Sequence, residues 1–192
     1  MASSKKKVIL RRVTGEILPG YLPLSGFTRG AGSSRVVELL DLSGRLIEIP
    51  LGEVRMISYV RDFNLADTTN PERLTRRSFL ARPRNEGVWV RMTFKASERS
   101  LERTSEIILE GLAAADLSLL DSLIEDGGLH VAPPDIRSNT QRIFVPRAAI
   151  ESLQILAVIT TPSRAKPVPE RTPEEIQKSL FEALTPRNTR PN

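Results

Sequence analysis

Apolar and polar residues alternate over several short runs of the chain, which is the pattern of half-buried β-strands. The strictest alternation covers residues 88–94, Val-Trp-Val-Arg-Met-Thr-Phe. Shorter runs with turn sequences between them fill the first part of the chain, at residues 8–10, 17–18, 36–40, 46–49 and 54–60. Short strands joined by glycine-containing turns are typical of small β barrels.

One pattern occurs twice in the chain, at residues 46–57 and at residues 142–156. In each copy a strand-like run reaches a proline, and aliphatic residues follow the proline four and seven positions later. Pro146 comes 96 residues after Pro50, and the aliphatic residues keep that offset. Proline cannot donate to a sheet, so we place it at a strand end before a tight bend. Gly20 and Gly111 also follow similar apolar runs, which favours an internal duplication.

We therefore expect a mainly β protein, built as a tandem pair of small SH3-like, Sm-like or PilZ-like β barrels with a C-terminal amphipathic helix. The predicted boundaries are residues 1–60 for the first barrel, 61–87 for an arginine-rich connector, 88–159 for the second barrel, 160–171 for a proline-rich linker and 172–185 for the helix.

Two segments allow more than one prediction. Leucines and alanines between residues 112 and 124 suit a helix face, whereas the repeat favours a strand there. In the connector, Asn70 and Pro71 form a good helix start and predict one helical turn over residues 73–77.

The predicted C-terminal helix begins with a capping signal, Thr172 followed by Pro173 and Glu175. Its apolar stripe consists of Ile176, Leu180, Phe181 and Leu184. A helix of about three turns is marginal in water without packing. It therefore docks either on the protein's own barrels or on a partner protein, and the sequence leaves both open.

Composition narrows the class of protein. The chain has 192 residues, no cysteine and one histidine, which excludes disulfides and zinc sites of the Cys/His type. The pI near 10.0 follows from a net charge of only +5, because almost nothing titrates between pH 7 and 10. We see no signal-peptide core and no apolar run long enough to cross a membrane, so we expect a cytoplasmic protein.

No set of residues predicts catalysis. His130 lies in a strand-like run with no carboxylate or serine at a motif spacing, so we interpret it as structural. We identify no catalytic residue, no metal site and no cofactor site, and we expect a non-enzymatic protein.

The connector has the strongest functional signal. Residues 71–84 contain five arginines and one acid, Glu72. Neighbouring arginine side chains can bind phosphate in a bidentate manner. Ion pairs with acids of the barrels, or simple solvation, are the structural alternatives.

Two short sequences resemble PilZ domains, which are β barrels that bind cyclic di-GMP. RLTRR at residues 73–77 has the Arg-x-x-x-Arg spacing, and DLSLLD at residues 116–121 is similar to Asp/Asn-x-Ser-x-x-Gly without the final glycine. The resemblance implies a cyclic di-GMP site made of Arg73, Arg76, Arg77, Asp116 and Ser118.

Residues 7–60 and 88–159 also each resemble Sm-like and SH3-like barrels, which bind RNA, peptides or their own kind. Residues 60–64 and 137–147 resemble an uncharacterised bacterial family of unknown function. We expect a non-enzymatic binding or regulatory module with cyclic di-GMP as ligand. The alternative is an Sm-like RNA-binding protein or a protein-interaction adaptor.

Overall fold

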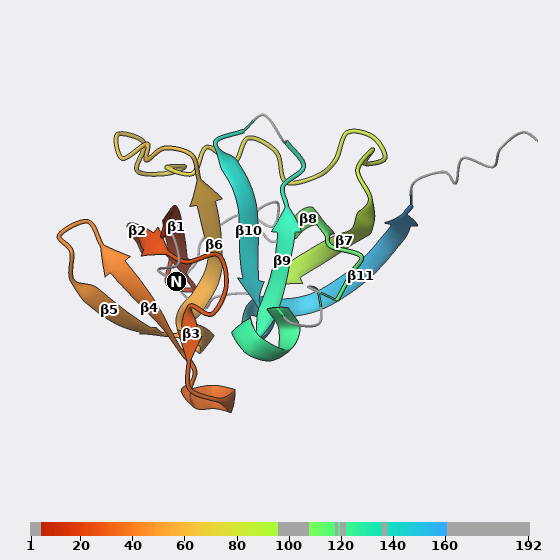
Figure 1. Ribbon diagram of the computed structural model, residues 1–192. Helices are drawn as coiled ribbons and strands as arrows, with labels where there is room; N and C mark the ends of the chain where they lie inside the picture. Colours follow the sequence, from red (N-terminus) through yellow and green to blue (C-terminus); the bar gives the residue numbers. More distant parts are fainter. Residues whose placement is uncertain (1–4, 96–107, 118, 120–121, 136–137, 161–192) are drawn as a thin grey trace, which may run out of the picture. The chain divides into compact units, whose positions relative to one another are not determined.

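The computed structural model describes residues 5–95, 108–117, 119, 122–135 and 138–160. Its strands form one antiparallel sheet of eleven strands, which does not close on itself (Figure 1). The prediction of a mainly β protein is confirmed.

Except for the two-residue β3, which was not predicted, the first strands follow the predicted runs closely. They are β1 (Lys6–Arg12), β2 (Ile17–Leu22), β3 (Thr28–Arg29), β4 (Val36–Asp41), β5 (Leu46–Pro50) and β6 (Val54–Val60). Two short 3₁₀ helices lie between them, η1 (Gly32–Ser34) and η2 (Leu51–Glu53). The turn between β1 and β2 contains Gly15 at a φ of 89°, a left-handed conformation that glycine adopts without strain.

The later strands are β7 (Gly87–Phe94), β8 (Ile108–Ala113), β9 (Gly128–Ala132), β10 (Thr140–Pro146) and β11 (Ile150–Ile159). A π-helical turn, η4 (Ser122–Asp126), precedes β9, and a 3₁₀ helix, η5 (Arg147–Ala149), joins β10 to β11. The sheet order is β11-β7-β8-β9-β10-β6-β1-β2-β4-β3, and β5 pairs with β4.

Two groups of five strands have the same order. We name β1, β2, β4, β5 and β6 the N-terminal strand set, with the order β6-β1-β2-β4-β5. We name β7 to β11 the C-terminal strand set, with the order β11-β7-β8-β9-β10. Each strand of one set therefore has an equivalent in the other.

The hydrogen-bonded registers of the two sets also correspond. Val8 pairs with Gly20 as Val90 pairs with Gly111. The pairing of β1 with β6 shifts register beside Arg12, and that of β7 with β11 shifts at the equivalent place, after Ile150. In both sets the proline ends a strand and a 3₁₀ helix follows directly.

The two sets are joined by antiparallel pairing of β6 with β10 (Figure 1). Strands of both predicted barrels therefore belong to one open sheet. The description as two separate barrels, with boundaries at residues 60 and 87, stays a prediction. The predicted linker beyond residue 160 and the predicted helix at 172–185 lie outside the described residues.

Each strand set has its own hydrophobic core, and each core takes one side chain from the other set. The N-terminal core contains Phe144 of β10, and the C-terminal core contains Met56 of β6. Burial of these side chains stabilises the joint between the sets, at about 1.5–3 kcal/mol for a fully buried side chain of this size.

The strand favoured for residues 112–124 is wrong. β8 ends at Ala113, and residues 122–126 form the turn η4. Contacts from β3 and from the loop before it hold this turn: Thr28 Oγ1 donates to Glu125 O at 3.2 Å, and Gly26 N donates to Asp126 Oδ1 at 3.2 Å. These long-range bonds override the local repeat.

The helical turn predicted over residues 73–77 is also wrong, although its cap forms. Leu74 N donates to Asn70 Oδ1 at 3.0 Å. Arg73 has a φ of 52°, in the left-handed region, so the chain leaves the helical path one residue before Leu74.

Candidate binding groove and arginine cluster

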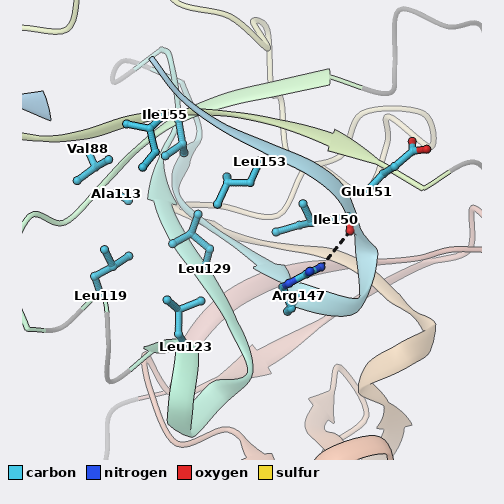
Figure 2. A pocket seen from close by; sticks show the side chains of 11 residues that line it. Val88, Ala113, Leu119, Leu123, Leu129, Arg147, Ile150, Glu151, Leu153 and Ile155 are labelled. Atoms are coloured by element: carbon cyan, nitrogen blue, oxygen red, sulfur yellow. Dashed lines mark hydrogen bonds between the residues drawn. The ribbon is translucent and has the colours of Figure 1, made fainter. Parts of the chain in front are cut away.

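An apolar groove lies on the C-terminal strand set (Figure 2). Its volume is about 400 Å³. The side chains come from β7, β8, β9, β11, η5 and the segment around η4, and they are Val88, Val90, Ala113, Leu119, Leu123, Leu129, Arg147, Ile150, Glu151, Leu153 and Ile155. Most of this lining is aliphatic, so the groove suits an apolar ligand.

The groove corresponds to the filled core of the N-terminal set. Leu153 and Ile155 of β11 are equivalent to Ile57 and Tyr59 of β6. The β7 residues that pair with the first two are themselves equivalent to the β1 residues that pair with the other two. Ile57 and Tyr59 are 0% and 2% exposed, whereas Leu153 and Ile155 are 51% and 67% exposed. The same sheet positions are thus closed in one set and open in the other.

Two differences in side chains explain the open groove. Phe27 and Phe144 fill the N-terminal core, with their rings 5.0 Å apart and nearly perpendicular. In the C-terminal set, Ala113 occupies the position of Leu22, since Lys6 pairs with Leu22 as Val88 pairs with Ala113. A smaller side chain, and the lack of an equivalent aromatic pair among the residues that the structure describes, leave the space unfilled.

Polar groups are few in the groove. Arg147 Nη1 donates to the Ile150 carbonyl oxygen at 3.3 Å, which holds the turn between β10 and β11 (Figure 2). Arg147 and Glu151 supply the charged groups of the lining. An apolar surface with a few polar groups is the usual composition of a binding site.

A second candidate site is a cluster of four arginines. Arg11 and Arg12 come from β1, Arg55 from β6 and Arg77 from the connector, and they line one small cavity with Gly15, Met56 and Phe94. The Arg55 guanidinium carbon lies 5.4 Å from the centre of the Phe94 ring, a cation–π contact.

Acidic residues pair with part of this cluster. Arg11 binds both carboxylate oxygens of the buried Glu72, at 2.7 and 2.9 Å. Arg12 contacts Glu16 at 2.9 Å and Glu53 at 3.4 Å. The Nε of Arg12 is buried and has no hydrogen-bond partner among the described residues. These ion pairs belong to the β1 arginines, whereas the alternative weighed from the sequence concerned the arginines of the connector.

The cavity between the four arginines measures about 20 Å³. A single water needs roughly 10–15 Å³ of such space, so the cavity holds a water-sized group and no nucleotide. A larger anion would lie over its mouth, with only a phosphate oxygen directed inward.

The predicted ligand residues are distributed over different parts of the fold. Arg77 belongs to the arginine cluster, and its carbonyl oxygen accepts from Glu110 N in β8 at 2.7 Å. Arg73 is exposed and its Nη2 donates to Asn64 Oδ1 at 2.9 Å, and Arg76 is exposed. Asp116 is exposed and follows the end of β8, whereas Ser118 lies outside the described residues.

The sequence did not reveal the groove, because its lining comes from four strands and a turn far apart in the chain. The signal that could have found it is the small Ala113 at the position where the first copy has Leu22. Of the arginine cluster, Arg77 was predicted and its three neighbours were not.

Buried Glu110 was also missed. It accepts hydrogen bonds from Phe79 N at 3.0 Å and Trp89 Nε1 at 3.2 Å, and it binds Arg91 at 2.8 Å. Its carboxylate thereby ties the connector to β7 and β8.

His130 is buried among three aromatic rings, Phe27, Tyr59 and Phe144. Its Nε2 lies 3.6 Å from Asp126 Oδ2, too far for a hydrogen bond. Burial lowers the pKa of His130, and the nearby Asp126 carboxylate acts in the opposite direction. This environment is that of a structural residue.

Within the described ranges, no group of three or more His, Asp or Glu side chains could hold a metal ion. No helix in the described part of the chain is long and apolar enough to cross a membrane. The cytoplasmic location stays a prediction.

The fold and the groove define a mainly β protein with an open antiparallel sheet and an apolar groove on its C-terminal strand set. The chain belongs to a family of unknown function, DUF6982, whose model matches residues 4–157. The predicted membership of an uncharacterised domain family is thereby confirmed. No curated protein matches the chain, and no solved structure matches it.

Proposed function

We propose that the protein is a non-enzymatic binding module whose apolar groove takes an apolar segment of a partner protein. The observation that carries this proposal is the exposure of Leu153 and Ile155, at 51% and 67%, beside a cavity of about 400 Å³. Ligand pockets have volumes of about 300–1,000 Å³ and mainly apolar linings. Contiguous exposed apolar surface of this kind marks interaction sites.

The tandem arrangement is part of the proposal. The matching strand order and registers support two copies of one β unit, in which the first copy has a filled core and the second keeps its core accessible. The first copy then serves as a scaffold, and the second binds the partner.

Fluorescence of 1-anilinonaphthalene-8-sulfonate, an amphipathic anion whose rings emit strongly in apolar surroundings, tests whether the groove is accessible. The folded full-length chain should enhance the emission of the probe, because the groove offers it a dry apolar surface. Leu153→Asp should reduce this enhancement at least about twofold, since a carboxylate in the groove opposes burial of the probe.

Leu80→Asp is the matched control, because Leu80 is 82% exposed and does not line the groove. It should leave the emission unchanged. Equal emission from the wild type and from Leu153→Asp would contradict the proposed groove, provided that both variants melt as folded proteins.

Cyclic di-GMP at the arginine cluster is the second candidate function. It is supported by the meeting of Arg77 with Arg11, Arg12 and Arg55, because arginines around one point can bind phosphate. The ligand would rest over the mouth of the cavity. RNA is the competing anion at the same arginines.

Calorimetry distinguishes these anions. Cyclic di-GMP should release heat at micromolar concentrations, and Arg77→Ala should abolish the signal while Arg82→Ala retains it. Absence of heat at high micromolar ligand would reject the nucleotide. Binding of a short RNA that weakens steeply with salt would favour RNA, because phosphate contacts release counterions.

The predicted C-terminal helix is a further interaction element of the proposed adaptor, with a partner protein or the protein's own body as its docking surface. Truncation after Pro162 separates the two. An unchanged melting temperature favours a partner, and a decrease of several degrees favours docking on the body.

A further inference from the structure

β11 is an edge strand within the described sheet, because only β7 pairs with it (Figure 1). Its equivalent β6 has two neighbours, β1 and β10. β11 is ten residues long and exposes Leu153, Ile155 and Val158 by 51%, 67% and 55%. A long apolar edge strand is a template for pairing with another chain.

The pairing of β10 with β6 is an example of a strand that binds the edge equivalent to the outer edge of β11. The two strands are antiparallel, with Phe144 opposite Ile57 and Arg142 opposite Tyr59. Phe144 is 0% exposed and fills the N-terminal core beside Phe27. One strand thus supplies both the backbone partner of the edge and the side chain that closes the core.

We propose that an extended segment of the partner protein pairs antiparallel with the outer edge of β11 and places a bulky apolar side chain opposite Leu153, in the groove. The inference rests on the proposed function and specifies the form of its ligand. Main-chain hydrogen bonds supply affinity in this binding mode, and the pocket for alternate side chains supplies specificity.

The geometry disfavours β5 of a second copy of the chain as the occupant. The strand equivalent to β10 is β5, because Pro50 and Pro146 hold the same place against β4 and β9. At the position of Phe144, β5 has Glu48, which binds Arg29 at 3.0 Å. Placing this carboxylate in an apolar groove would cost desolvation energy.

The probe for this inference is a synthetic peptide with the sequence of residues 138–148, SNTQRIFVPRA, which contains β10. A fluorescein-labelled peptide should bind the full-length chain, as measured by anisotropy. The same peptide with Phe144→Glu should bind at least about tenfold more weakly, because the carboxylate cannot enter the groove without losing water. A third peptide, N-methylated at the amides that would face β11, should weaken by a similar factor since it cannot donate to the edge.

The chain offers matched variants. Leu153→Asp should weaken binding of the unmodified peptide at least about tenfold, and Leu80→Asp should leave it unchanged. Hydrogen exchange of the complex should show new protection at residues 153–155 rather than at residues 57–59, whose edge β10 already occupies.

The outcomes separate this inference from the proposed function. Equal binding of the N-methylated peptide means that the groove takes an apolar segment without strand pairing, which overturns the inference and leaves the proposed function intact. Equal binding of the Phe144→Glu peptide, or no peptide binding while the fluorescent probe still enters the groove, also overturns it. Failure of both the peptide and the probe rejects both proposals.

Discussion

At the scale of single residues, the fold depends on buried charges that the sequence did not mark. Glu72 and Glu110 are 1% and 2% exposed, and each holds an arginine and part of the connector. Pattern analysis treats glutamate as a surface residue, so neither was predicted. The sequence does not show which side chains surround each carboxylate in the fold, so it does not indicate that the carboxylates are buried.

Glu110→Ala should lower the free energy of unfolding by about 2–3 kcal/mol. The substitution removes the acceptor of Phe79 N and Trp89 Nε1, and buried donors without acceptors cost about 1–3 kcal/mol. Urea denaturation measures the change, with Glu86→Ala at an exposed position as the control. A loss below about 0.5 kcal/mol, the usual range of surface substitutions, would contradict this role.

His130 predicts a pH dependence of stability. Its pKa is lowered by burial, so between about pH 6.5 and the lower folded-state pKa the unfolded chain binds a proton that the folded chain does not. Stability should therefore fall as the pH drops below about 6.5. His130→Leu should flatten this part of the stability profile measured by urea denaturation, and an unchanged slope in the variant would contradict the assignment.

At the scale of elements, most strands were predicted from the alternation of apolar residues, because a strand with one buried face leaves that signature. The proline at the end of β5 and β10 fixed the bend before β6 and β11. Predictions failed at residues 112–124 and 73–77, where residues far away in the chain form hydrogen bonds to the segment or beside it, as Gly26 does with Asp126 and Asp135 does with Thr75. The local sequence pattern does not predict hydrogen bonds to other parts of the chain.

Gly111 is predicted to be required in β8 because of close packing. A Cβ at this position would lie 2.5 Å from Val131 Cβ in β9, closer than real contacts allow. Gly111→Ala should therefore destabilise the protein by about 1–3 kcal/mol, as overpacking in a core does. Gly52→Ala is the control, since nothing lies within 4 Å of its added Cβ. Equal thermal melting of the two variants would refute the packing argument.

At the scale of the whole molecule, the repeat in the sequence anticipated the equivalent order of two strand sets. It did not anticipate that β6 and β10 join these sets into one sheet, because pairing between strands 80 residues apart leaves no local pattern. The candidate site differs from the predicted one for the same reason: cyclic di-GMP was expected at the connector, whereas the apolar groove lies on the C-terminal set. Ligand identity depends on side chains brought together by the sheet.

The proposed function requires that the C-terminal strand set leaves accessible the core positions that are filled in the N-terminal strand set. Hydrogen–deuterium exchange of the free full-length chain tests this most directly, by comparing residues 150–159 with residues 54–60. The outward-facing amides of β11 should exchange much faster than those of β6, whose outer edge is bonded to β10. Equal protection of the two strands would mean that the β11 edge is already occupied, and it would contradict the proposed binding site.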